Sequence, residues 1–378
     1  MPTAIPRRDF LQMAGAGLGL LALGIPAHAT AGRERLMRTR EILETIIREY
    51  ATARDEPWLL MHAIRAMGKD FSIGDEPAVA YLCRRYLQET SVNGKSYLHM
   101  PISHEGHANA FLAEAVLDSG IDATYAFRTN DRNYSIADLI AGAKARFDLD
   151  TRTLSTRSIT FNADDLAFSL VAFAYSTERA GEWVNAYGNS IHMAALADYG
   201  LEALESANKL FEASMRQGLL AAGPDRIHDF ACGGMHLIYG LSTCLRLGHL
   251  QPAQAERMKT QFDIVTWRLK SDSALVERHY NVLADQYPAE VVRIHRLSAK
   301  LKLLGHGLEV INHARHHGLF IPTAAQDDDI GRAHEELFDV IEAVGPDGPR
   351  TAHDATLFKY LVGDACHAYR GVTMARLA

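Results

Sequence analysis

The sequence predicts an all-α fold: a single toroid of six helical hairpins, (α/α)6. Apolar residues recur with helical periodicity along most of the chain, whereas the alternation typical of β-hairpins is scarce. The helical segments fall into pairs, in which a longer amphipathic helix precedes a shorter, more apolar one. No linker separates the pairs, so we expect one closed ring with the apolar helices inside. An open α-solenoid is the alternative architecture.

Each expected hairpin follows from periodicity and capping residues. The outer helices are expected over 33–53, 76–90, 135–147, 189–217, 251–271 and 326–344. The inner helices are expected over 57–68, 105–118, 163–177, 232–248, 304–317 and 352–370. A further helix over 288–302 is expected as an insertion in the fifth pair. Pro57 and Gly68 fit the start and the end of an inner helix, and Ser135 fits an N-cap.

Composition excludes several classes of protein. The chain has 378 residues, is 48% hydrophobic and carries 39 Lys+Arg against 46 Asp+Glu, which gives a formal net charge of -7. Such a chain can bury a large core, and its acidic balance disfavours a nucleic-acid partner. The 4 Cys are too few for a disulfide scaffold, whereas 18 His is a high count of groups that titrate or ligate near neutral pH.

The N-terminus predicts export. Arg7-Arg8 opens a twin-arginine pattern, an apolar run follows from Met13 to Ile25, and Ala27-His28-Ala29 fits a cleavage site. We therefore expect residues 1–29 to be a signal peptide read by the twin-arginine translocase, and 30–378 to be one toroid domain. The expected location is the periplasm or beyond. We expect no membrane span in the mature chain.

Histidines recur near the expected starts of the inner helices. Five of the six starts carry one, and the remaining start carries Asp164-Asp165. In a toroid these starts would meet at one mouth of the central cavity, which is the default place for an active site. Each histidine taken alone is equally well explained as a core residue bonded to backbone. The five are His62, His107, His236, His306 and His353.

Two of these stretches place reactive groups on one helix face. Cys232-Gly-Gly-Met-His236 sets a thiol and an imidazole four residues apart, and Gly305-His306-Gly-Leu-Glu309 sets an imidazole and a carboxylate three apart. Two chemistries fit. A zinc site would take nitrogen and sulfur ligands from His107, Cys232, His236 and His306. Alternatively, acid–base chemistry on a sugar or sugar acid, which requires no cofactor, would use His236, His306, Glu309 and His353.

Side chains that suit sugar binding lie near the same helix starts and in one connection. Aromatic rings stack on sugars, and amides and imidazoles form hydrogen bonds with them. The substrate-binding candidates are His62, His107, Asn109, Trp183, Tyr187 and Tyr239.

The stretch Leu304-Gly-His-Gly-Leu-Glu-Val-Ile resembles the G-H-x-x-E inner-helix motif of N-acylglucosamine and cellobiose 2-epimerases. More widely, the chain is similar to the six-hairpin toroid enzymes that process glycans. This resemblance implies a sugar-binding mouth with His306 and Glu309 in the motif's places and His236 or His353 as a second histidine. The Cys232–His236 stretch is similar to the Cys/His elements of lanthionine-cyclase toroids, which bind zinc.

The leading hypothesis is an exported carbohydrate-active enzyme of the epimerase or lyase type. Its inner-helix histidines would abstract and return a proton beside a carbonyl or carboxylate. The first alternative is a zinc-dependent toroid enzyme centred on Cys232 and His236. The second is a non-catalytic toroid that binds a glycan or a peptide in the same cavity.

Overall fold

The computed structural model describes residues 27–150, 155–156, 163–179, 181–220 and 234–375. These residues are mostly helical, which confirms the all-α class. The expected signal peptide lies outside them except for its last three residues, which stand in the first helix. None of the helices in the described stretches combines the length and the apolarity that a bilayer crossing requires.

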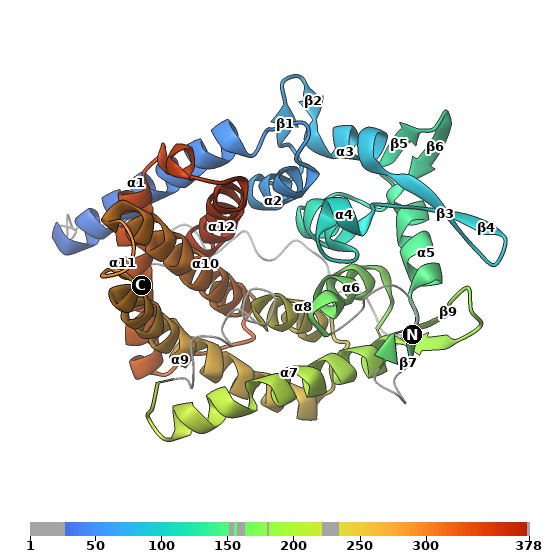
Figure 1. The fold of residues 1–378 in the computed structure, drawn as a ribbon. Coiled ribbons are helices and arrows are strands. Elements are labelled where there is room, and N and C mark those ends of the chain that lie inside the picture. Colours follow the sequence, from blue (N-terminus) through green and yellow to red (C-terminus); the bar gives the residue numbers. More distant parts are fainter. Residues whose placement is uncertain (1–26, 151–154, 157–162, 180, 221–233, 376–378) are drawn as a thin grey trace, which may run out of the picture.

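Six segments surround the middle of the molecule in Figure 1, and each packs against the next. They are α2 (Pro57–Met67), the π-helix η1 (Phe111–Asp118), α6 (Ala163–Ser176), α8 (Met235–Arg246), α10 (Ala289–His316) and α12 (Ala355–Thr373). Helix α12 also packs against α2, so this succession of helices closes on itself. Each segment therefore has neighbours on two sides, which accounts for its high apolar content.

A second set of helices lies outside the first in Figure 1. It comprises α1 (Ala27–Tyr50), α3 (Ala78–Tyr86), α5 (Ile136–Arg146), α7 (Met193–Arg216), α9 (Pro252–Leu283) and α11 (Ala324–Val344). Helix α5 begins as predicted, because the Ser135 hydroxyl accepts from the backbone N–H of Asp138 and the Asp138 carboxylate accepts from the backbone N–H of Ser135. A short α4 (Ile102–Glu105) and a 3-10 helix η4 (Gly348–Thr351) complete the helices described.

Short antiparallel pairs of strands lie in the connections between helices. The pairs are β1 (Ser72–Ile73) with β2 (Glu76–Pro77), β3 (Gln88–Val92) with β4 (Lys95–His99), β5 (Ala126–Thr129) with β6 (Arg132–Ser135), β7 (Leu149–Asp150) with β8 (Ser155–Thr156), and β9 (Glu182–Val184) with β10 (Ser190–His192). The longest pair has the register Gln88↔His99 to Val92↔Lys95. Each pair is a local hairpin, so the strands join no common sheet.

The fifth pair of helices differs from the expectation. The segments 288–302 and 304–317 form one continuous helix, α10, and α9 extends to Leu283. Gly305 suggested a helix start, but it lies inside α10 where that helix crosses α12. A Cβ atom at Gly305 would lie 3.1 Å from the backbone nitrogen of Ala368. The glycine therefore permits close packing of two helices and breaks neither of them.

Candidate functional site

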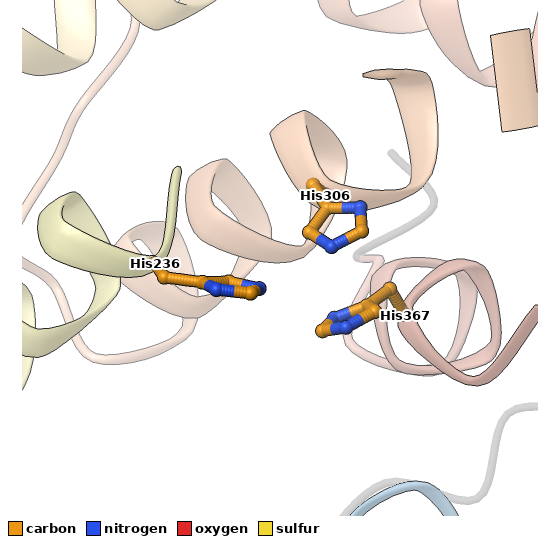
Figure 2. Close-up of side chains that lie close together, drawn as sticks. All are labelled: His236, His306 and His367. Atoms are coloured by element: carbon orange, nitrogen blue, oxygen red, sulfur yellow. The ribbon is translucent and has the colours of Figure 1, made fainter. Parts of the chain in front are cut away.

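Three histidines from three helices meet in the interior. His236 comes from α8, His306 from α10 and His367 from α12, and Figure 2 shows their rings close together. One nitrogen of each ring lies within 4.8 Å of one nitrogen of each of the others. The side chains are buried, with 7%, 2% and 2% of their surface exposed. The cluster thus lies within the protein, away from bulk water.

The orientation of His306 is set by its own helix. Its Nδ1 lies 2.8 Å from the carbonyl oxygen of Lys302. Because a carbonyl oxygen can accept but not donate, Nδ1 carries the proton and Nε2 carries the lone pair. This Nε2 is buried and forms no hydrogen bond with a described residue. A lone pair is therefore available in the interior.

The orientation of His367 is set by a carboxylate. Its Nδ1 lies 2.7 Å from Oε2 of Glu309. Nη1 of Arg65 is 3.2 Å from the same nitrogen, but a guanidinium can only donate, so the two contacts demand opposite roles of Nδ1. The shorter, charge-assisted bond to Glu309 assigns the proton to Nδ1 and the lone pair to Nε2. An imidazole whose N–H is held by a carboxylate or a backbone carbonyl is the usual arrangement of a metal ligand.

His236 has no hydrogen-bond partner on either ring nitrogen among the described residues. Its ring centroid lies 5.2 Å from that of His306 and 5.4 Å from that of His367. Leaving a buried polar atom without a partner costs about 1–3 kcal/mol. A ligand that accepts the lone pair of His236 would remove this cost for that nitrogen.

Burial keeps the three imidazoles neutral. It lowers the pKa of His236, His306 and His367 well below the usual value of 6.5. Neighbouring groups add to this effect: the imidazole of His306 further lowers the pKa of His236, and the guanidinium of Arg65 further lowers the pKa of His367. The neutral imidazole is the form that binds metal ions.

A second group of possible ligands shares His367. One ligand atom each of His62, Glu114 and His367 lies within 4.8 Å of those of the other two. Nδ1 of His62 lies 2.8 Å from the carbonyl oxygen of Trp58, which leaves its Nε2 with the lone pair. Neither oxygen of Glu114 forms a hydrogen bond with a described residue, although Oε1 lies 3.2 Å from Nη1 of Arg65.

A buried network of ion pairs adjoins the histidines. Arg65 contacts Glu114, Asp118 and Glu309 at 3.2, 3.1 and 3.0 Å, and Arg370 contacts Asp118 and Glu309 at 2.8 and 2.6 Å. Burial alone would raise the pKa of Asp118 and of Glu309, but the two guanidinium groups lower both pKa values. Three carboxylates face two guanidiniums, so the network has one formal negative charge in excess. A cation in the adjoining cluster would balance it.

A cavity of about 10 Å³ touches His236. The polar groups around it belong to Arg65, Glu114, Asp118, His236 and Tyr239. A space of this size holds about one water molecule. There is thus room beside His236 for one molecule of the size of water.

The donor set fits a transition-metal ion. Imidazole nitrogen suits zinc and its neighbours in the first transition row, and catalytic zinc sites combine three protein ligands with one open position. His236, His306 and His367 could supply three ligands, and the small cavity lies beside His236. The unpartnered nitrogens of His236 and His306 are the observation that supports the fit.

The structure brings several sequence-predicted residues to this cluster. His236 and His306 belong to it, and Glu309 holds His367. The Tyr239 hydroxyl lies 2.7 Å from Oδ1 of Asp118 in the ion-pair network. His62 belongs to the neighbouring group. The ring of His107 lies 5.7 Å from that of His236, and Cys232 falls outside the described residues.

Other predicted residues lie elsewhere. His353 was predicted as catalytic, but it lies outside α12, because Asp354 caps the start of that helix. Its side chain is 45% exposed, and its Nε2 lies 3.3 Å from Nε2 of His295. Trp183 donates its indole N–H to the carbonyl of Lys144. The remaining two, Asn109 and Tyr187, line a separate cavity.

The expectation that the histidines share the starts of inner helices is wrong for His306. This residue and His367 lie well inside α10 and α12. The candidate site is therefore formed by the middles of helices as well as by their ends.

Sequence reasoning missed His367, Arg65, Glu114, Asp118 and Arg370. The sequence does contain a signal that links them with the predicted residues. Five segments each place two polar side chains three or four residues apart inside an apolar stretch. The pairs are His62 and Arg65, Glu114 and Asp118, His236 and Tyr239, His306 and Glu309, and His367 and Arg370. Residues at this spacing share one helix face.

No protein-family model, no curated protein and no solved structure matches this chain.

Proposed function

We propose that this chain is a metal-dependent enzyme whose ion is held by His236, His306 and His367. The proposal is carried by the convergence of these three imidazoles, whose nitrogens lie within 4.8 Å of one another. In His306 and His367 the Nδ1 proton is bonded to an acceptor, the carbonyl of Lys302 and the carboxylate of Glu309 respectively. The lone pair of each Nε2 is therefore left to bind the ion. Zinc is the ion class that the donors favour.

When bound, the ion supplies Lewis acidity, which polarises a carbonyl or phosphoryl oxygen. The chain's own residues would do the rest. Glu309 orients His367, and Arg65 and Arg370 each hold Glu309 in place through one contact with its carboxylate. These groups act on the ligands and fix their geometry.

Tyr239 would keep a proton beside the small cavity. Its hydroxyl donates to Asp118 and accepts from Nη2 of Arg370 at 2.7 Å. Burial raises the pKa of Tyr239 well above its usual value, although the two nearby arginines act in the opposite direction. In this proposal Tyr239 stays protonated, lines the small cavity and holds Asp118 and Arg370 in position.

The architecture, the substrate class and the location form the wider part of the proposal. The closed succession α2, η1, α6, α8, α10, α12 supports the inner wall of an (α/α)6 toroid. A carbohydrate or sugar acid is the proposed substrate, on the strength of the Gly305–Glu309 motif. Export by the twin-arginine route to the periplasm rests on the N-terminal pattern.

Metal analysis of the purified protein tests the centre. We expect about one zinc-class ion per chain after incubation with zinc and desalting, with nitrogen ligands at about 2.0–2.1 Å by X-ray absorption. His306→Ala and His367→Ala should each lose most of the ion. The control is His353→Ala, which removes an exposed imidazole. Substoichiometric metal in the parent protein, or full retention in both interior variants, would contradict the proposal.

Activity is tested on a panel of uronic-acid oligosaccharides and amino sugars. Any turnover found should stop after treatment with a chelator and return with added zinc. The metal-free acid–base alternative has one observation in its favour, the His367–Glu309 pair, since a carboxylate-held imidazole is the usual general base. Turnover that survives complete removal of metal would favour this alternative.

A further inference from the structure

A second cavity, of about 500 Å³, lies apart from the histidine cluster. Its walls come from the β3–β4 hairpin, the α4 region and the end of α5, which are neighbours in Figure 1. The volume is within the range of about 300–1,000 Å³ that small-molecule sites occupy. The cavity is therefore large enough for a ligand the size of one or two sugar rings.

Arg146 brings a guanidinium to this cavity. It is the last residue of α5, and its Nε is buried without a hydrogen-bond partner among the described residues. The only described carboxyl group whose charge acts on the pKa of Arg146 is that of Glu105. Burial lowers the pKa of Arg146, which reflects the cost of holding this charge away from water. An anion on the guanidinium would offset that cost.

The acidic group in the cavity wall is engaged elsewhere. Glu105 accepts the backbone N–H of Asn109 at 3.0 Å and that of Phe111 at 2.9 Å, one on each carboxyl oxygen. Burial raises the pKa of Glu105 to about 8, so its negative charge is incomplete at neutral pH. The nearby His99 donates Nδ1–H to the carbonyl of Met100 and brings no negative charge. The one carboxyl group in the lining of the cavity therefore neutralises Arg146 only in part.

The rest of the wall suits an organic body. Hydroxyl groups of Thr90, Ser91, Ser103 and Tyr187 can form hydrogen bonds, and Met100 and Phe147 offer apolar surface. A guanidinium beside such a mixed wall recognises planar or tetrahedral oxyanions through paired N–H donors. We infer that this cavity binds a small organic anion, whose carboxylate or phosphate group lies on Arg146.

One chain segment connects the wall of the cavity with the histidine cluster. Glu105 and Asn109 line the cavity, and between them His107 places its ring 5.7 Å from that of His236. Asn109 has a φ of 64°, a conformation that residues other than glycine adopt rarely and that recurs at functional sites. The inference concerns anion binding alone and does not depend on metal at His236.

Calorimetric titration of the purified protein tests the site with three matched probes: glucuronate, glucose 6-phosphate and uncharged glucose. We expect one or both anions to bind and glucose to bind at least about tenfold more weakly, because glucose cannot form a charge-assisted hydrogen bond with the guanidinium. The anion that binds identifies the group as carboxylate or phosphate. Binding of neither anion, or equal binding of glucose, would overturn the inference.

Variants locate the binding. Arg146→Gln should weaken anion binding at least about tenfold, and Arg146→Lys, which keeps the charge but loses the paired donors, should fall between it and the parent. Arg128→Gln is the control, because Arg128 is an exposed arginine on β5. Unchanged affinity in a folded Arg146→Gln or Arg146→Lys protein, checked by circular dichroism, would contradict the assignment to Arg146.

Discussion

His306 and His367 stack on each other across the interface of α10 and α12, with ring centroids 3.7 Å apart and an interplanar angle of 28°. Two glycines make this close contact between the helices possible. A Cβ at Gly305 would lie 3.1 Å from the backbone nitrogen of Ala368, and one at Gly371 would lie 3.1 Å from that of Glu309. The close approach of α10 and α12 at these glycines therefore determines the distance between the two imidazole rings.

Substitution of Gly305 tests this coupling. Gly305→Ala places a methyl group against the α12 backbone, so we expect the free energy of unfolding to fall by about 1–3 kcal/mol. The same variant should bind zinc more weakly, because the rings of His306 and His367 must separate. Urea unfolding and metal titration measure the two effects.

Gly331→Ala is the matched control for that experiment. Gly331 lies in α11, and a Cβ there would have no atom within 4 Å. The added methyl group should stabilise the protein by about 0.5–1 kcal/mol, the usual gain of Ala over Gly inside a helix. Equal effects of Gly305→Ala and Gly331→Ala would show that close packing at Gly305 is unimportant.

Glu309 has two measurable roles. Glu309→Gln leaves Arg65 and Arg370 with one buried partner fewer, which should cost about 3–5 kcal/mol of stability. It also weakens the bond that orients His367, so zinc affinity should fall about 10- to 100-fold. Glu290→Gln, which breaks an exposed pair with Arg293, should change stability by less than about 1 kcal/mol. Unaltered zinc affinity in Glu309→Gln would argue against its orienting role.

Stability of the metal-free protein should fall on acidification. The folded-state pKa of His236, His306 and His367 is lower than the usual 6.5, so the unfolded chain binds more protons than the folded chain below about that pH. Each such histidine removes up to about 1.4 kcal/mol per pH unit as the pH falls from about 6.5 toward its folded-state pKa. His313, with its pKa lowered to about 3 by burial, acts in the same direction.

Two carboxyl groups oppose this trend. Burial raises the pKa of Asp364 to about 7 and of Glu105 to about 8, so between their unfolded and folded pKa values they favour the folded state more as the pH falls. The buried imidazoles are more numerous, and the net effect should be a loss of stability between about pH 7 and pH 5. Urea unfolding across this range measures it. Stability that rises on acidification would contradict the neutral state of the interior histidines.

Substitution of Tyr239 should change the stability of the protein without changing its metal content. Tyr239→Phe removes hydrogen bonds to Asp118 and Arg370 and leaves these charged groups with fewer partners. We expect a loss of about 1–3 kcal/mol in the free energy of unfolding. Metal content should be unchanged, because Tyr239 is not among the ligands. Loss of the ion in a folded Tyr239→Phe protein would place Tyr239 in the coordination shell.

Local signals predicted much of the fold. The start of α5 follows from the Ser135 cap, and both ends of α2 follow from Pro57 and Gly68, because capping and helix-breaking depend on neighbouring residues. The continuity of α10 could not be predicted in this way. Gly305 is read alike as a helix start or as a packing glycine until the position of Ala368 is known.

The candidate site was predicted only in part, because local spacing identifies residues that share a helix face but does not identify their partners on other helices. The spacing of His306 and Glu309 correctly placed both on one helix face, but Glu309 bonds to His367, which is 58 residues away in sequence. His367 stands within the apolar stretch Ala365–Ala368 and far from the start of its helix, so a search confined to helix starts passed over it. Long-range partners are determined by tertiary packing, which local spacing does not encode.

The contact between Arg370 and Arg65 has a consequence for folding. Nη1 of Arg370 donates to the carbonyl oxygen of Arg65 at 2.9 Å, across 305 residues of sequence. Contacts of such separation form late, because a long loop must close before they stabilise the chain. The histidine cluster needs α12 as well, since His367 belongs to that helix. During synthesis the histidine cluster can therefore assemble only after α12 has left the ribosome, and ion uptake would report that α12 has docked.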